Sequence, residues 1–157
     1  MKNNELEKFL DLNTDHYFKK TKRIILKNKD MQVTYAVFMR RPVLFCPSLA
    51  IKWLRKIEKI RNTKFNIKMC YKEGEWVGAG EPLMFLSGKF SQLVELETTY
   101  LQLIGPASVA AYNAFKMCTD LPNTAFMAMD ARHCAGAHMH ELMAYGASVG
   151  SNKAKKR

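Results

Sequence analysis

The fold is decided by one stretch of the sequence, AFMAMDARHCAG at residues 125–136. The residues from Thr124 to Met129 have the apolar pattern of a buried strand, and they lead into a polar loop that holds Arg132. A helix is predicted to follow, roughly over residues 137–149. A strand, a loop and a helix in this order form one βα unit, and α/β folds often place their chemistry in the loop after the strand. A single unit of this kind cannot close a barrel.

Upstream of this unit the patterns predict helices that alternate with short strands. Residues 14–28 contain no glycine or proline and predict a helix with Tyr17, Ile24 and Ile25 on one face. Residues 33–39 are rich in β-branched and aromatic side chains and predict a strand. From Pro47 onward, apolar residues at helical spacing predict a second helix, whose other face carries lysine and arginine.

The middle of the chain predicts a small sheet followed by long helices. Residues 65–69 alternate with period two, further short strands are expected at 76–77 and 83–86, and turns are expected at Gly74, Gly78, Gly80 and Gly88. Residues 73–83 look like the half-barrel hammerhead of biotinyl and lipoyl carriers. No lysine lies between Lys72 and Lys89 to hold such a cofactor, so a structural sandwich is expected. A helix is predicted from Ser91, with a break near Gly105-Pro106 and an almost wholly apolar continuation to Met117.

Charge is distributed unevenly along the 157 residues, whose net charge is +11. Residues 1–72 carry 18 Lys/Arg and 6 Asp/Glu, whereas residues 73–152 carry 3 and 8. The positive charge of the N-terminal half could attract nucleic acid, an acidic membrane surface or a small phosphate ester. It is equally expected if these lysines and arginines simply lie on solvated helix faces. The four cysteines lack CxxC spacing and are expected to be reduced thiols. Because no window has the apolar length of a membrane span, a cytoplasmic protein without membrane contact is expected.

Three residues are candidates for binding a substrate. Arg132, just beyond a predicted strand, has the fork geometry and permanent charge to bind a phosphate, or it pairs with Asp130. Lys153 follows a helix that ends in small residues, so it could meet a phosphate or simply complement the helix dipole. Tyr17 is either a core residue or a stacking platform for a flat heterocycle.

The end of the same loop has the residue types of a metal site. The residue types that zinc accepts are dense there, at His133, Cys134, His138, His140 and Glu141. On a helix, however, His138 and His140 lie roughly 200° apart and cannot both face one ion. No protein-bound metal is therefore predicted.

The motifs taken together resemble a nicotinate phosphoribosyltransferase, a member of the type II phosphoribosyltransferases that also include the quinolinate enzymes. The resemblance is carried by Thr14-Asp15-x-Tyr17, Gly80-Glu81-Pro82-Leu83, Glu97-Thr98-x-x-Leu101 and Asp130-Ala131-Arg132 in this order. It implies an α+β fold in which an N-terminal α/β sandwich, with a hammerhead-like sheet, precedes an incomplete α/β barrel. We place the sandwich at residues 1–122 and the first barrel elements at 123–157.

The resemblance also implies an activity. Family members join nicotinate to phosphoribosyl pyrophosphate, usually with magnesium and in some classes with ATP, and so serve NAD biosynthesis as pentosyltransferases or ligases. They form homodimers in which the N-terminal domain of one subunit covers the barrel mouth of the other. Tyr17 would then pack on the pyridine ring across the dimer, Arg132 would bind phosphate or carboxylate, and Lys153 would lie near phosphate. The remaining catalytic residues stay unassigned.

The quinolinate branch is the alternative within the family. It typically carries arginine directly after the glutamate of the central helix, whereas this chain has Thr98. Because an unpaired buried carboxylate is costly, nicotinate fits better than the dicarboxylate quinolinate. Relatives continue through further βα units, so the 157 residues alone are expected to be inactive. Outside the family, a basic nucleic-acid-binding module or an assembly subunit remains open, although no nucleic-acid motif is present.

Overall fold

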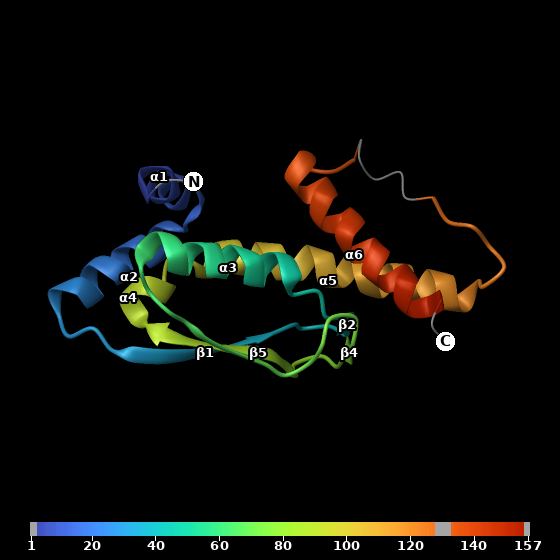
Figure 1. Cartoon of the computed structure of the whole chain (residues 1–157), viewed down its shortest axis with the longest axis horizontal. Coiled ribbons are helices and arrows are strands. Elements are labelled where there is room, and N and C mark those ends of the chain that lie inside the picture. Colours follow the sequence, from blue (N-terminus) through green and yellow to red (C-terminus); the bar gives the residue numbers. More distant parts are fainter. Residues whose placement is uncertain (1–2, 128–132, 156–157) are drawn as a thin grey trace.

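The computed structural model describes residues 3–127 and 133–155 of the chain. These residues form helices and short strands in an alternating order (Figure 1). The elements are α1 (Asn3–Asn13), α2 (His16–Lys27), β1 (Gln32–Phe38), β2 (Val43–Leu44), α3 (Ser48–Arg61), β3 (Asn66–Met69), β4 (Trp76–Val77), β5 (Pro82–Lys89), α4 (Phe90–Leu93), α5 (Glu97–Asp120) and α6 (Ala137–Lys155).

Two small antiparallel sheets form one layer of the molecule. The larger has the strand order β1-β5-β3, and the smaller pairs β2 with β4. Helices α3 and α5 lie along one side of the larger sheet (Figure 1). This is the α/β sandwich with small open sheets that the sequence predicts, and the strands expected at 33–39, 65–69, 76–77 and 83–86 are all confirmed to within a few residues.

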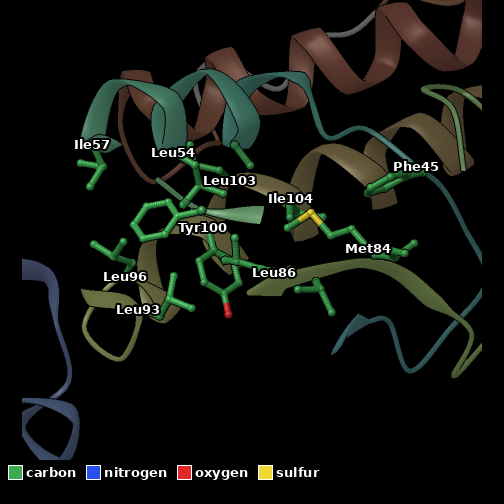
Figure 2. Packing of buried hydrophobic residues seen from close by; sticks show 14 of the residues in the cluster. Phe45, Leu54, Ile57, Met84, Leu86, Leu93, Leu96, Tyr100, Leu103 and Ile104 are labelled. Atoms are coloured by element: carbon green, nitrogen blue, oxygen red, sulfur yellow. The ribbon is translucent and has the colours of Figure 1, made fainter. Parts of the chain in front are cut away.

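The core fills the space between the helices and the sheet (Figure 2). Leu54 and Ile57 of α3 are fully buried because the apolar residues of that helix recur every three or four positions. They pack in one cluster with Leu86 of β5 and with Tyr100 and Ile104 of α5. The cluster fixes α5 against the sheet, so the position of the first turn of α5 is set by the core.

Helix α6 packs along α5 through two glycines. A Cβ atom built on Gly146 would lie 2.1 Å from the backbone oxygen of Ala107, and one on Gly150 would lie 2.0 Å from that of Ala111. Both glycines and both alanines are buried. The small residues near the end of α6 therefore bring its backbone against α5, so the close approach that they allow is used for helix packing.

The predicted break at Gly105-Pro106 is wrong, because α5 runs through both residues without interruption. Proline 106 removes one helical hydrogen bond, but residues buried on both sides of it, among them Ile104 and Ala107, hold the helix against its neighbours. The chain instead leaves the helical path at residues 94–96. There the backbone oxygen of Glu95 accepts a hydrogen bond from the Thr14 hydroxyl at 3.0 Å.

The strand expected at 124–129 is not formed over residues 124–127, and residues 128 and 129 lie outside the described part of the chain. Phe126 and Met127 are 39% and 83% exposed. A strand needs a neighbour to satisfy its backbone groups, and none of the described strands pairs with this segment. Gly88 is also not a turn residue, since it lies within β5. The helix predicted from residue 137 is confirmed as α6, and the domain boundary near residue 122 stays a prediction.

Candidate substrate-binding site

Tyr17 lies in the first turn of α2, with its side chain on the outer surface. The buried face of α2 carries Phe18 and Ile25, which pack with Val94. Tyr17 is 59% exposed and Ile24 is 54% exposed, so the face predicted from Tyr17, Ile24 and Ile25 is only partly correct. The Tyr17 ring lies against Phe18, with a centroid distance of 4.0 Å. Tyr17 is therefore a surface aromatic ring supported from one side.

Two carboxylates and three tyrosines influence one another's pKa, and we call these residues the tyrosine–carboxylate cluster: Asp15, Tyr17, Tyr35, Glu97 and Tyr100. Desolvation and then the negative charges of Glu97 and Asp15 raise the pKa of Tyr17. Burial, Glu97 and Tyr17 raise the pKa of Tyr35 to about 12. Tyr100 is almost fully buried, and its pKa is raised by burial and by the charges of Glu97 and Tyr35. The five residues come from α2 and the residue before it, from β1 and from α5.

Glu97 stands in the first turn of α5 and is partly buried. Burial and the nearby charge of Asp15 raise the pKa of its carboxyl group. The next residue, Thr98, donates a hydrogen bond of 3.3 Å from its hydroxyl to Oδ2 of Asp15. The position after the glutamate therefore ties the start of α2 to the start of α5 and brings no positive charge to the cluster.

The other two predicted site residues lie elsewhere. Lys153 is in the last turn of α6. The C-terminal end of α6 and helix α2 are at opposite ends of the molecule, so one chain does not bring Lys153 and Tyr17 together (Figure 1). Arg132 lies outside the described residues.

The candidate metal ligands do not gather into a site within the part of the chain that the structure describes. Among those residues, no group of three or more histidine, cysteine or acidic side chains is placed to hold an ion. Cys134 instead contacts the sulfur of Met143 on α6, at 3.6 Å.

A groove of about 750 Å³ runs between α5, α6 and residues 124–127. Its walls are mostly small and apolar, including Ala114, Met117, Phe126 and Met143, and Lys155 is the lining residue with a positive charge. Such a wall suits packing against apolar groups better than binding of phosphate.

The comparisons with known proteins agree with this fold. Residues 15–108, well over half of the chain, match the family described as quinolinate phosphoribosyl transferase, N-terminal domain. The chain belongs to the quinolinate phosphoribosyl transferase family. The match runs from Asp15 to Ser108, so it includes all five residues of the tyrosine–carboxylate cluster. A search of curated proteins found no match.

Solved structures of similar fold include two nicotinate-nucleotide pyrophosphorylases and a nicotinic acid phosphoribosyltransferase. The nicotinate-nucleotide pyrophosphorylase from Pyrococcus furiosus is 20% identical, with a TM-score of 0.72 over 88% of this chain and 36% of that chain. The Francisella tularensis nicotinate-nucleotide pyrophosphorylase is 17% identical, with a TM-score of 0.67 over 95% and 51%. Human nicotinic acid phosphoribosyltransferase is 19% identical, with a TM-score of 0.68 over 87% and 34%. The chain thus spans about a third to a half of the length of these structures, and at such identities the likeness shows the fold.

Sequence reasoning found Tyr17 but missed two other members of the cluster. The sequence pattern predicts Tyr35 only as a strand residue and does not distinguish Tyr100 from the other residues of its helix. A signal was present for Tyr100, because it follows Glu97 by three positions and the two residues therefore share a helix face. No such local signal links Tyr35 to Tyr17, since their proximity depends on how β1 packs beside α2 and α5.

Proposed function

We propose that this chain is the N-terminal part of a phosphoribosyltransferase that joins nicotinate to phosphoribosyl pyrophosphate, giving nicotinate mononucleotide and pyrophosphate. The observation that carries the choice of nicotinate is Thr98. Its hydroxyl binds Asp15, where the quinolinate branch would place an arginine to meet a second carboxylate. A dicarboxylate would find acidic groups at this position, whereas a monocarboxylate can turn its charge away.

In this proposal Tyr17 supplies the surface on which the pyridine ring stacks. Its ring lies against Phe18 and the residue is 59% exposed, which leaves room for a flat heterocycle to stack on it. Arg132 and Lys153 would bind phosphate or carboxylate groups. Because Lys153 and Tyr17 are far apart in one chain, a homodimer in which Tyr17 serves the partner's barrel accounts for both roles. Magnesium would accompany phosphoribosyl pyrophosphate, and ATP is a further candidate substrate.

Breaking the bond at the anomeric carbon needs fixed charges more than a nucleophilic side chain. Positive charge develops on the ribose and negative charge on the departing pyrophosphate, so positioning and electrostatic stabilisation are the expected sources of catalysis. The 157 residues supply the ring platform, and the ribose and magnesium contacts would come from further barrel units.

The test is formation of nicotinate mononucleotide from nicotinate, phosphoribosyl pyrophosphate and Mg²⁺, with quinolinate assayed in parallel. We expect no turnover by the 157 residues alone. We expect nicotinate-dependent turnover when the chain is joined to the barrel portion of a nicotinate phosphoribosyltransferase, and a fall in kcat/KM of roughly tenfold or more in the Tyr17→Ala variant. Turnover by these 157 residues alone would contradict the expectation that they are inactive, and a preference for quinolinate would contradict the assigned substrate.

A further inference from the structure

A second groove, of about 440 Å³, lies between α3 and the edge strand β3 of the larger sheet. Its α3 wall consists of residues at positions i, i+3, i+4 and i+7, which share one face of the helix: Ser48, Ile51, Lys52 and Arg55. Its β3 wall consists of Ile67 and Met69, which alternate along the strand and therefore share one face of the sheet. One helix face and one strand face thus enclose a groove with apolar walls and a cationic rim.

The outer edge of β3 is open beside this groove. In the strand order β1-β5-β3, β3 pairs with β5 on one side, and no described strand pairs with its other side. Within the described part of the chain, the backbone of Asn66–Met69 forms no hydrogen bond with the backbone of any other segment. An open edge offers N–H and C=O groups to an added strand. Alternate side chains of such a strand would lie on the same face as Ile67 and Met69 and would enter the groove.

The charge around this edge is positive. Residues 59–72 include no acidic residue, and Lys64, Lys68 and Lys72 in this stretch are all exposed. A second copy of the chain that paired through the same edge would bring these lysines against one another, and like charges on neighbouring strands destabilise their pairing. An acidic strand would instead meet opposite charges, so charge complementarity favours an acidic partner.

The two cations that line the groove differ in their surroundings. Arg55 forms an ion pair with Glu58 at 2.7 Å. Lys52 is exposed and forms no ion pair with any residue that the structure describes. Lys52 is therefore the cation on the groove wall that is available to a carboxylate, while Lys68 lies on the opposite face of β3 because it alternates with Ile67 and Met69.

We propose that the edge of β3 binds an extended acidic segment of a partner protein, which adds a strand to the sheet. Apolar side chains at alternate positions of that segment pack against Ile51, Ile67 and Met69. The carboxylates between them lie beside Lys68 on the other face, and Lys52 attracts the segment from the rim of the groove. Backbone hydrogen bonds supply affinity in this mode of recognition, and the alternating side chains supply specificity. The interaction goes beyond the proposed transferase function and uses none of its substrate-binding residues.

The test measures the binding of three fluorescein-labelled hexapeptides to the full chain by fluorescence anisotropy. The first alternates glutamate with valine and has both features of the proposed ligand. The second alternates glutamate with serine and lacks the apolar side chains, and the third alternates lysine with valine and has the opposite charge. We expect the first peptide to bind roughly tenfold or more tightly than either of the others. Amide hydrogen exchange, followed by NMR with saturating peptide, should become slower within Asn66–Met69, because an added strand bonds the open edge.

Two charge reversals on α3 separate a contact in the groove from general attraction. Lys52→Glu changes a residue that lines the groove, and Lys56→Glu is the matched control, because Lys56 is exposed on the same helix but does not line it. Both variants change the net charge equally. Lys52→Glu should weaken binding of the glutamate–valine peptide roughly fivefold, and Lys56→Glu less than about twofold. Lys68→Glu, on the other face of β3, is a second variant and should also weaken binding roughly fivefold.

Several results would overturn this proposal. They are no binding of the glutamate–valine peptide, equally tight binding of the glutamate–serine peptide, equal losses in Lys52→Glu and Lys56→Glu, and unchanged hydrogen exchange in β3. Sedimentation that depends on protein concentration, and that changes in Lys68→Glu, would assign the edge to a second copy of the chain and would also overturn it. None of these results bears on whether nicotinate mononucleotide is formed.

Discussion

Single glycines decide how closely the last helix approaches the body of the protein. Gly146 and Gly150 each face a backbone oxygen of α5, and a backbone oxygen cannot move aside as the end of a flexible side chain can. Gly105, on α5 itself, has open space where a Cβ would lie. The same substitution should therefore have opposite effects at Gly146 and at Gly105.

We expect Gly146→Ala to lower the free energy of unfolding by about 2–3 kcal/mol, because the added methyl group would force α5 and α6 apart. Gly105→Ala should instead raise it by roughly 0.5–1 kcal/mol, because alanine restricts the unfolded chain and favours the helix. Chemical denaturation followed by circular dichroism measures both. Equal effects of the two substitutions would mean that the close approach at Gly146 is relieved at little cost.

A second prediction concerns the ion pairs at the turn between α4 and α5. The carboxylate of Glu95 accepts hydrogen bonds from Arg61 and, at 2.7 Å, from Lys22. The Arg61 side chain is 7% exposed, so removing the charge of Glu95 leaves a buried guanidinium that keeps the carboxylate of Glu7 and the backbone oxygen of Gln92 as partners. Glu95→Gln should cost about 3 kcal/mol of stability. Glu7→Gln is the control, because Glu7 is half exposed and should change the stability by less than about 1 kcal/mol.

At the scale of the element, Glu58 joins the end of α3 to the start of β3. Its carboxylate accepts hydrogen bonds from Arg55 at 2.7 and 2.9 Å and from the backbone N–H of Phe65 at 2.7 Å. Burial raises the pKa of Glu58, but these hydrogen bonds and the charges of Arg55 and Lys64 outweigh burial, and the net pKa lies below its ordinary value. Glu58 therefore stabilises the fold when it is ionised.

The sign of this shift fixes a pH dependence. Because the folded-state pKa is lowered, the contribution of Glu58 is complete above the ordinary value of 4.5 and is lost as the pH falls below it. Glu58→Gln should cost about 1–3 kcal/mol at pH 7, and clearly less at acid pH, in denaturation curves taken at both. Glu97→Gln is the contrast: burial and Asp15 raise the pKa of Glu97, so ionised Glu97 destabilises the fold and its replacement should not lower stability at pH 7.

Some helices and strands could be predicted from the local sequence, and others depend on tertiary packing. Strand β5 and helix α3 follow from local periodicity, because each buries one face against the same core. The continuity of α5 through Pro106 does not follow from the local sequence, because packing on both sides of the proline overrides its preference to break a helix. Helix α1 was not predicted, although Leu6 and Leu10 are buried at helical spacing. Of the candidate site, Tyr17 was predictable from its motif, whereas Tyr35 joins the cluster only through tertiary packing.

Over the whole molecule, ion pairs use part of the basic excess of the N-terminal half. Lys19, Lys22, Arg55 and Arg61 each pair with a carboxylate in the described structure. What remains on α3 is a face with Lys52, Lys56 and Lys59, and it is exposed. The positive charge that distinguishes this half of the sequence thus serves in part to hold α1, α2 and α3 in place. None of the described helices is long and apolar enough to cross a membrane.

This distribution predicts weak binding to nucleic acid. A module built for nucleic acid should lose affinity steeply with salt, because each phosphate contact releases counterions. With three exposed lysines on the face of α3, we expect single-stranded DNA to bind with a Kd weaker than about 10⁻⁶ M near physiological salt and with a shallow slope. Fluorescence anisotropy over a salt titration measures both, and a variant with Lys52, Lys56 and Lys59 changed to serine should remove most of the remaining affinity at low salt. Submicromolar binding with a steep slope would favour the nucleic-acid module over the transferase.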